Sequence, residues 1–146
     1  MTRLLFGQDQ AVAAWAKDKY AAGLAPWISA LGIVDRDNRI VGAATLHDYN
    51  GSNVELCYWG PRSLSRYVAG GIALFCFRVL RVNRVTCRTP RSNKIVARHL
   101  TKLGFRYEGL LRSYYGPSRA QDAIMFGLLA TDATRLLGGL NEPKSA

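Results

Sequence analysis

The chain has 146 residues, of which 49% are hydrophobic and 21% are charged. This balance is typical of a globular protein and argues against a disordered chain. No apolar run reaches the roughly 20 residues that a membrane-spanning helix needs, and the first ten residues lack the apolar core of a signal peptide. We therefore expect a single domain over residues 1–140, a tail over 141–146, a cytoplasmic location and no membrane partner.

Positive charge is the first unusual feature of the sequence. Twenty Lys and Arg residues oppose ten Asp and Glu residues, which gives a formal net charge of +10. Residues 62–112, from Arg62 to Arg112, hold ten Arg and two Lys against the single acid Glu108, a net charge of +11. Such a segment attracts nucleic acid or a ligand that carries several phosphates. The alternative is a solvated face that only aids solubility.

Metal and disulfide chemistry have little support in the sequence. The chain has three Cys and two His residues, and none of them stands at the spacing of a metal-binding motif. We expect reduced thiols and no metal site.

The first half of the chain predicts a strand, a helix and an antiparallel meander of three strands. Asp and Asn residues at 35–38 and the Asn50-Gly51 pair are typical of tight turns between strands. The expected elements are a strand at 2–6, a helix at 8–20 and strands at 27–34, 39–47 and 53–59.

The second half alternates helices and strands. Ser92 is a good cap for a helix that opens at Asn93, and Gly104 stands where a helix ends. The expected elements are helices at 64–80 and 93–103, strands at 84–88, 105–114 and 123–129, and a short closing helix at 132–137. The order β-α-β-β-β-α-β-α-β-β predicts a mixed, mostly antiparallel α/β sheet with helices on both faces.

The joint between the third meander strand and the following helix is a candidate anion site. The unpaired N–H groups of a helix N-terminus attract anions, and small residues let a phosphate approach the backbone. The alternative is that the glycines only permit close packing of the helix on the sheet. The residues concerned are Arg62, Ser65, Arg66, Ala69, Gly70 and Gly71.

The segment from Asn93 onward carries a resemblance to a known family. Asn93 opens a helix, Gly104-Phe105 follows eleven residues later, and Glu108-Gly109 and Arg112 come next. This pattern resembles the GNAT superfamily of acyl-CoA-dependent acyltransferases. It is most similar to the branch that acetylates the N-termini of ribosomal proteins and to small GNAT proteins of bacteriophages.

The resemblance implies a GNAT-like fold and an acetyl-CoA site. The backbone of Cys57, Tyr58 and Trp59 would bind the pantetheine arm, and Asn93 would hydrogen-bond it near the thioester. The loop and helix start named above would hold the pyrophosphate. Ala69 replaces the first glycine of the family's phosphate motif, which leaves the geometry of that loop open.

For proton transfer we consider two candidate bases. Glu55 interrupts an apolar strand beside the expected thioester site, and an environment of that kind suits a general base. The alternative is a salt bridge with a neighbouring Arg. His47 is the second candidate, because an imidazole titrates near neutral pH. The family's tyrosine acid is absent, since Leu100 stands in its place; Tyr114 or Tyr115 is a candidate substitute.

The resemblance therefore implies an N-acyltransferase that moves an acetyl group from acetyl-CoA to an amine by direct attack on the thioester. The acceptor would be a protein amine or nucleic acid. The alternative is a non-catalytic module of the same fold that binds nucleic acid through its basic face. The oligomeric state stays open.

Overall fold

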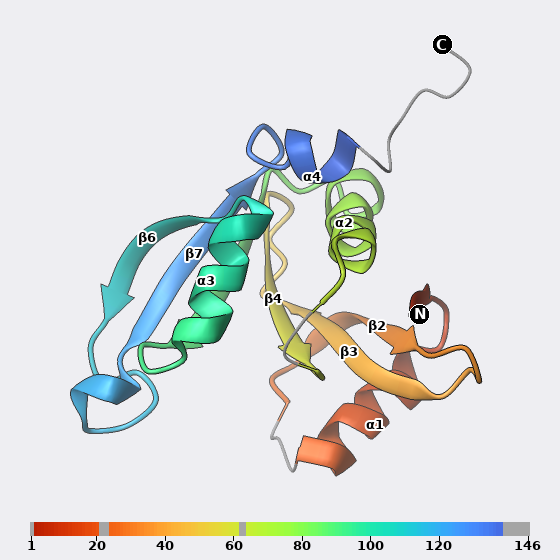
Figure 1. Ribbon diagram of the computed structural model, residues 1–146, viewed down its shortest axis with the longest axis horizontal. Coiled ribbons are helices and arrows are strands. Elements are labelled where there is room, and N and C mark those ends of the chain that lie inside the picture. The colour runs from red at the N-terminus through yellow and green to blue at the C-terminus, as the bar shows by residue number, and fades with distance from the viewer. Residues whose placement is uncertain (1, 21–23, 62–63, 139–146) are drawn as a thin grey trace.

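The computed structural model describes residues 2–20, 24–61 and 64–138. A seven-stranded sheet with the order β1-β2-β3-β4-β5-β7-β6 forms its centre (Figure 1). The strands are β1 (Arg3–Leu5), β2 (Trp27–Val34), β3 (Ile40–His47), β4 (Asn53–Trp59), β5 (Arg84–Pro90), β6 (Arg106–Leu111) and β7 (Ala123–Leu129). The helices are α1 (Asp9–Tyr20), α2 (Arg66–Leu74), the π-helical turn η1 (Phe75–Val79), α3 (Lys94–Leu103), the 3-10 turn η2 (Arg119–Gln121) and α4 (Thr134–Gly138).

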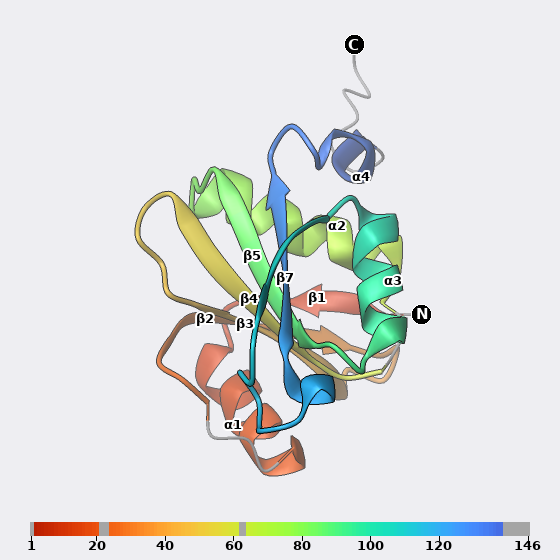
Figure 2. The ribbon, with the colours of Figure 1, turned by 90° about the vertical axis from the view of Figure 1, so that its left-hand side faces the viewer.

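Helices cover both faces of the sheet, as the sequence predicts (Figure 2). Residues of α2, α3 and α4 pack with the sheet in one large core, and α1 packs on the opposite face over β2 and β3. All neighbouring strands are antiparallel except β4 and β5, which are parallel. The predicted order of elements and the mixed α/β class are therefore confirmed.

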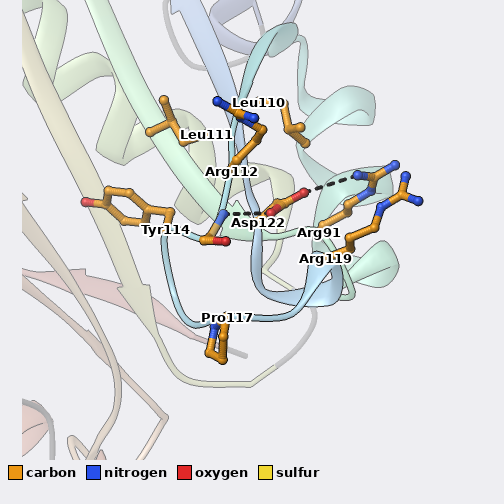
Figure 3. Close-up of a pocket in the computed structure, with 9 residues that line it drawn as sticks. Arg91, Leu110, Leu111, Arg112, Tyr114, Pro117, Arg119 and Asp122 are labelled. Atoms are coloured by element: carbon orange, nitrogen blue, oxygen red, sulfur yellow. Dashed lines mark hydrogen bonds and ion pairs between the residues drawn. The ribbon is translucent and has the colours of Figure 1, made fainter.

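The second half departs from the predicted boundaries in two places. The strand predicted to reach residue 114 ends at Leu111, because Ser113 turns the chain with a φ of 53°. The Ser113 N–H donates to the buried carboxylate of Asp122 at 2.7 Å, which holds this turn in place (Figure 3). The long helix predicted at 64–80 begins after Ser65, whose hydroxyl accepts from the Val68 N–H, and changes to π-helical geometry at Phe75.

The two parallel strands separate at the centre of the sheet. Pairing of β4 with β5 covers only Asn53 to Glu55 on β4 and Arg84 to Thr86 on β5. Beyond this point β4 stays paired with β3, and β5 stays paired with β7. Each strand follows its outer neighbour, so the twisted sheet opens into a slot between 56–59 and 87–90.

No helix in the described part of the chain has the length and apolar character needed to cross a membrane.

Candidate active site

A cavity of about 330 Å³ lies beside the slot, on the face covered by α2 and α3. Apolar side chains make up most of its wall. Its lining residues include Leu56 and Tyr58 from β4, Ala69, Ile72 and Ala73 from α2, Val96, Leu100 and Leu103 from α3, and Val85 and Cys87 from β5. The backbone of Cys57, Tyr58 and Trp59 runs along this cavity with a strand partner on only one side. A narrow, extended ligand with amide groups fits such an edge, because it can complete the hydrogen bonding of the open strand.

Tyr58, Asn93 and His99 bring polar groups to the wall of this cavity. The Tyr58 hydroxyl donates to the Pro61 carbonyl at 2.8 Å, and desolvation raises the pKa of Tyr58 to about 12. Asn93 caps α3, with its Oδ1 accepting from the Val96 N–H at 3.2 Å, and its amide N–H₂ group plays no part in that cap. His99 Nε2 is buried and is the one such side-chain nitrogen or oxygen without a hydrogen-bond partner in the described residues. Buried polar atoms normally have a hydrogen-bond partner, so a ligand in this cavity could form a hydrogen bond with His99 Nε2.

The N-terminus of α2 provides a second, polar region. Ser65 and Arg66 are exposed there, and the first turn of α2 contains no acidic residue. Arg66 shares a surface hollow with Lys102 at the end of α3 and Arg106 at the start of β6. Asp132 also lines this hollow and pairs with Arg106 at 3.0 Å. Arg66, Lys102 and the helix N-terminus are therefore the groups that suit a phosphate there. Arg62 lies outside the described residues.

The glycines of this helix have different surroundings. Gly70 is buried. Gly71 faces β1, where an added Cβ would lie 2.5 Å from Leu4 Cδ1. Close packing of α2 on the sheet therefore explains why residue 71 is a glycine. Such packing is the alternative to phosphate binding that the sequence leaves open. Ala69 lies on the other side of α2, in the wall of the cavity.

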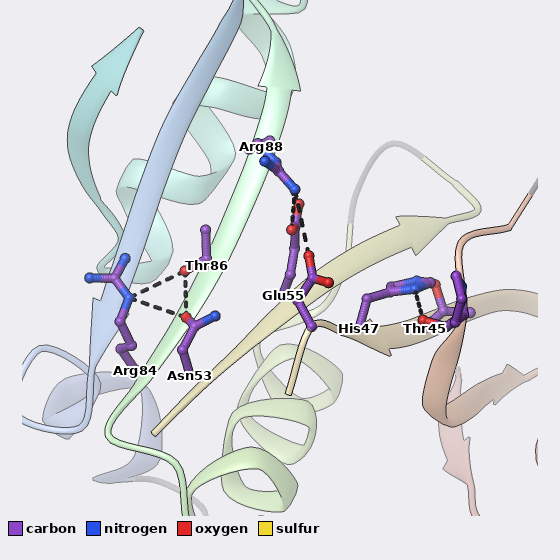
Figure 4. Close-up of polar contacts among 9 residues, drawn as sticks. Thr45, His47, Asn53, Glu55, Arg84, Thr86 and Arg88 are labelled. Carbon is purple, nitrogen blue, oxygen red and sulfur yellow. Dashed lines mark hydrogen bonds and ion pairs between the residues drawn. The ribbon is translucent and has the colours of Figure 1, made fainter. Parts of the chain in front are cut away.

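Glu55 lies on the opposite face of the sheet from the cavity, at the residue where β4 leaves β5. The residue is 9% exposed, and its carboxylate makes a two-pronged ion pair with Arg88 of β5, with Nε to Oε2 at 2.6 Å (Figure 4). The Arg88 guanidinium also lies 4.9 Å from the centre of the Tyr114 ring. The carboxylate therefore stands at the mouth of the slot, held in one orientation by an arginine from the facing strand.

His47 lies directly across from Glu55 on β3 and is 4% exposed. Its Nδ1 is 3.0 Å from the Pro26 carbonyl, which only accepts, so Nδ1 carries a proton. Its Nε2 lies 2.8 Å from the Thr45 hydroxyl, and the oxygen of that hydroxyl accepts from the indole N–H of Trp59. Both ring nitrogens of His47 are therefore engaged within the fold, while both carboxylate oxygens of Glu55 accept from Arg88.

A second ion pair lies on the same face of the sheet, at the start of β5. Arg84 pairs with Glu108 of β6 at 2.5 Å, and its Nε contacts Asn53 and Thr86. Figure 4 shows Arg84 with Asn53 and Thr86 to one side of the Glu55–Arg88 pair. This cluster closes the paired end of β4 and β5, where no slot exists.

The thiols and phenols near the slot stay protonated at neutral pH. Desolvation, with a contribution from Glu55, raises the pKa of Cys57 to about 11. Desolvation also raises the pKa of Cys87 and of Tyr115 to about 12. Since the thiolate is the nucleophilic form of cysteine, Cys57 and Cys87 are poor nucleophiles here, and Tyr115 retains its proton for donation.

Sequence reasoning missed four residues of this region. Arg88 could have been found, because strand alternation places it on the same face as Glu55 once β4 and β5 are neighbours. Lys102 and Arg106 come near Arg66 only in the folded chain, where the three residues line one hollow. The position of His99 in the cavity wall depends on how α3 is rotated on the sheet.

The architecture is that of a known class of enzymes, although no protein-family model and no curated protein matches the sequence. The spermidine/spermine N-acetyltransferase SpeG of Vibrio cholerae superposes with a TM-score of 0.72 at 13% identity, covering 92% of this chain and 98% of that one. A dodecameric structure of the spermidine N-acetyltransferase from the same organism superposes with a TM-score of 0.74 at 13% identity, covering 94% of this chain and 97% of that one. A GCN5-related N-acetyltransferase from Brucella melitensis gives 0.63 at 22%, covering 80% of this chain and 58% of that one. These similarities show that the chain has the fold of the GNAT N-acetyltransferases.

Proposed function

We propose that the protein is an N-acyltransferase that moves an acetyl group from acetyl-CoA to an amine. One observation carries the proposal: β4 and β5 part after three paired residues and open a slot beside an apolar cavity, within a fold shared with N-acetyltransferases. The open edge of β4 and the slot suit the pantetheine arm, whose amides can pair with backbone groups of 56–59. The hollow that contains Arg66, Lys102 and Arg106 suits the phosphates of the donor.

The chemistry follows from the placement of Glu55. With the thioester in the slot, an amine that approaches from the Glu55 face attacks the carbonyl carbon, forming a C–N bond as the C–S bond breaks. Glu55 takes the amine proton, directly or through water, and the leaving thiolate takes a proton from solvent or a phenol. An N–H of the open β4 edge near Cys57 or Tyr58 would stabilise the developing oxyanion. The raised pKa of Cys57 disfavours an acyl-cysteine intermediate and so supports direct transfer.

The acceptor would approach over two arginine–glutamate pairs. Arg84 pairs with Glu108, and Arg88 pairs with Glu55, so these side chains give the face little net charge. They do not select against a polyamine such as spermidine, on which the neighbours from Vibrio cholerae act. The net charge of +11 over residues 62–112 is what favours an acceptor with negative charge around its amine, on a protein or a nucleic acid.

Calorimetric titration with acetyl-CoA tests the proposal. The wild type is compared with two variants, Asn93→Ala and Asn93→Ser. The wild type should show saturable binding of one acetyl-CoA per chain. Asn93→Ala should weaken donor binding and lower the free energy of unfolding by about 1 kcal/mol, since the α3 cap is lost. Asn93→Ser keeps a capping oxygen, so it should restore stability without restoring affinity. No heat of binding at millimolar acetyl-CoA would refute the proposed function.

A second prediction concerns the unpartnered nitrogen of His99. Burying such an atom costs about 1–3 kcal/mol, so His99→Leu should raise the thermal midpoint of the protein without ligand. If the donor satisfies Nε2, the same variant should bind acetyl-CoA about tenfold more weakly, a loss of about 1.4 kcal/mol. Thermal unfolding and calorimetry measure the two effects. A lower midpoint with unchanged donor affinity would show that the ring serves only packing.

A further inference from the structure

A large open groove lies at the free end of the β6–β7 hairpin, apart from the cavity beside α2. Its volume is about 1,040 Å³, and Arg91, Arg112 and Arg119 line it together with Tyr114 and Asp122 (Figure 3). The three arginines come from different segments: the β5–α3 loop, the end of β6 and the turn η2. The fold therefore gathers at one surface cations that are distant in the sequence.

The charge of this groove is only partly neutralised. Its single acid, Asp122, is 4% exposed and is committed to the Ser113 N–H at 2.7 Å and to Arg91 Nη1 at 3.2 Å. The hydrogen bond from Ser113, followed by the arginine, holds the pKa of Asp122 below its ordinary value. Arg112 and Arg119 are exposed and form no ion pair with a carboxylate of the described residues. Two guanidinium groups are thus free to bind an anion.

Exposed aromatic rings lie at the side of the groove nearest Glu55. Tyr114 and Tyr115 are 47% and 44% exposed and contact each other edge to face, with ring centres 5.0 Å apart. Tyr114 also lies under Arg88, the partner of Glu55. The surface therefore leads from free arginines, past aromatic rings, to the mouth of the slot.

We propose that this groove binds single-stranded nucleic acid, with phosphates on the arginines and a base against Tyr114. Arginines that follow a backbone and aromatic rings that stack on bases are the two components of single-strand binding sites. Unpaired bases are required for stacking, which favours a single strand over a duplex, and an acidic peptide would leave the rings without flat partners. The site is separate from the donor cavity, so binding does not depend on acyl transfer.

Fluorescence anisotropy with a labelled single-stranded DNA oligonucleotide, without acetyl-CoA, tests this proposal. With one phosphate on each of the two free arginines, the logarithm of the binding constant should fall with the logarithm of the salt concentration with a slope of about −1.4. Arg112→Glu/Arg119→Glu should weaken binding more than tenfold and bring this slope close to zero. The charge-matched control Lys17→Glu/Arg36→Glu alters exposed residues of α1 and the β2–β3 turn, so it should have a much smaller effect.

Two further experiments distinguish binding of a nucleic acid from binding of an acidic peptide. Tyr114→Ala should weaken single-strand binding about tenfold and leave the salt slope unchanged, because stacking is lost and the phosphate contacts remain. Polyglutamate of equal charge should compete poorly. The proposal is overturned if the wild type does not bind the oligonucleotide at low salt. Equal losses in the groove and control variants, or equal competition by polyglutamate, would also overturn it.

Discussion

Replacing Glu55 by Gln is expected to lower kcat about 100- to 1,000-fold and to change the KM for acetyl-CoA less than about twofold. Gln preserves the size of the side chain and can still accept a hydrogen bond from Arg88. It cannot take the proton that the attacking amine must lose. Because Glu55 lies on the face of the sheet opposite the donor cavity, donor binding should be nearly unaffected. Steady-state kinetics with both substrates varied measure the two parameters.

The structure offers a matched control for this experiment. Glu108 is also paired with an arginine on the same sheet face, Arg84, but it lies at the closed end of β4 and β5. Glu108→Gln should therefore leave kcat within about twofold of the wild type. Glu55→Asp, which keeps the carboxylate, should recover part of the lost turnover. If Glu55→Gln and Glu108→Gln reduce activity equally and only in proportion to stability, Glu55 is a structural ion-pair partner.

Filling the cavity should have an effect of similar size on donor binding. Val96 is a partly buried residue of α3 that lines the cavity. In Val96→Trp the indole should occupy the space of the pantetheine arm and raise the Kd for acetyl-CoA at least about 100-fold, or roughly 2.7 kcal/mol. Calorimetry measures the affinity, and a parallel thermal unfolding curve reports any cost of overpacking.

The neighbouring position provides the comparison for this variant. Ile95 is 48% exposed on the same helix and does not line the cavity. Ile95→Trp should bind acetyl-CoA as the wild type does. Unchanged affinity in a folded Val96→Trp protein would place the donor elsewhere.

The elements that sequence reasoning predicted well are those with strong local signals. Asn50 accepts hydrogen bonds from the N–H groups of Ser52 and Asn53 in the predicted turn. Gly104 ends α3 with a φ of 109°, as predicted, whereas the residue that caps the start of α3 is Asn93 and not the predicted Ser92. These features depend on neighbouring residues and on backbone conformations that favour Asn or Gly, so a single sequence is sufficient to find them.

The features that sequence reasoning missed depend on distant contacts. The end of β6 is decided by Asp122, nine residues after the serine that it binds. His47 has a near-neutral side chain in the sequence, but Pro26 and Thr45 occupy both of its nitrogens. Gly71 looked like part of a phosphate loop until the packing of Leu4 against it was known. In each case contacts made in the folded chain determine the role, and the sequence pattern around the residue does not identify them.

A crystal structure of the protein with acetyl-CoA would test the central claim most directly. We predict that the pantetheine arm lies along residues 56–59 of β4. We also predict that the thioester carbonyl lies near Glu55, where β4 separates from β5. The phosphates should lie in the hollow that contains Arg66. Acetyl-CoA bound away from the slot, or β4 and β5 paired along their full length with the cavity filled by side chains, would contradict this account.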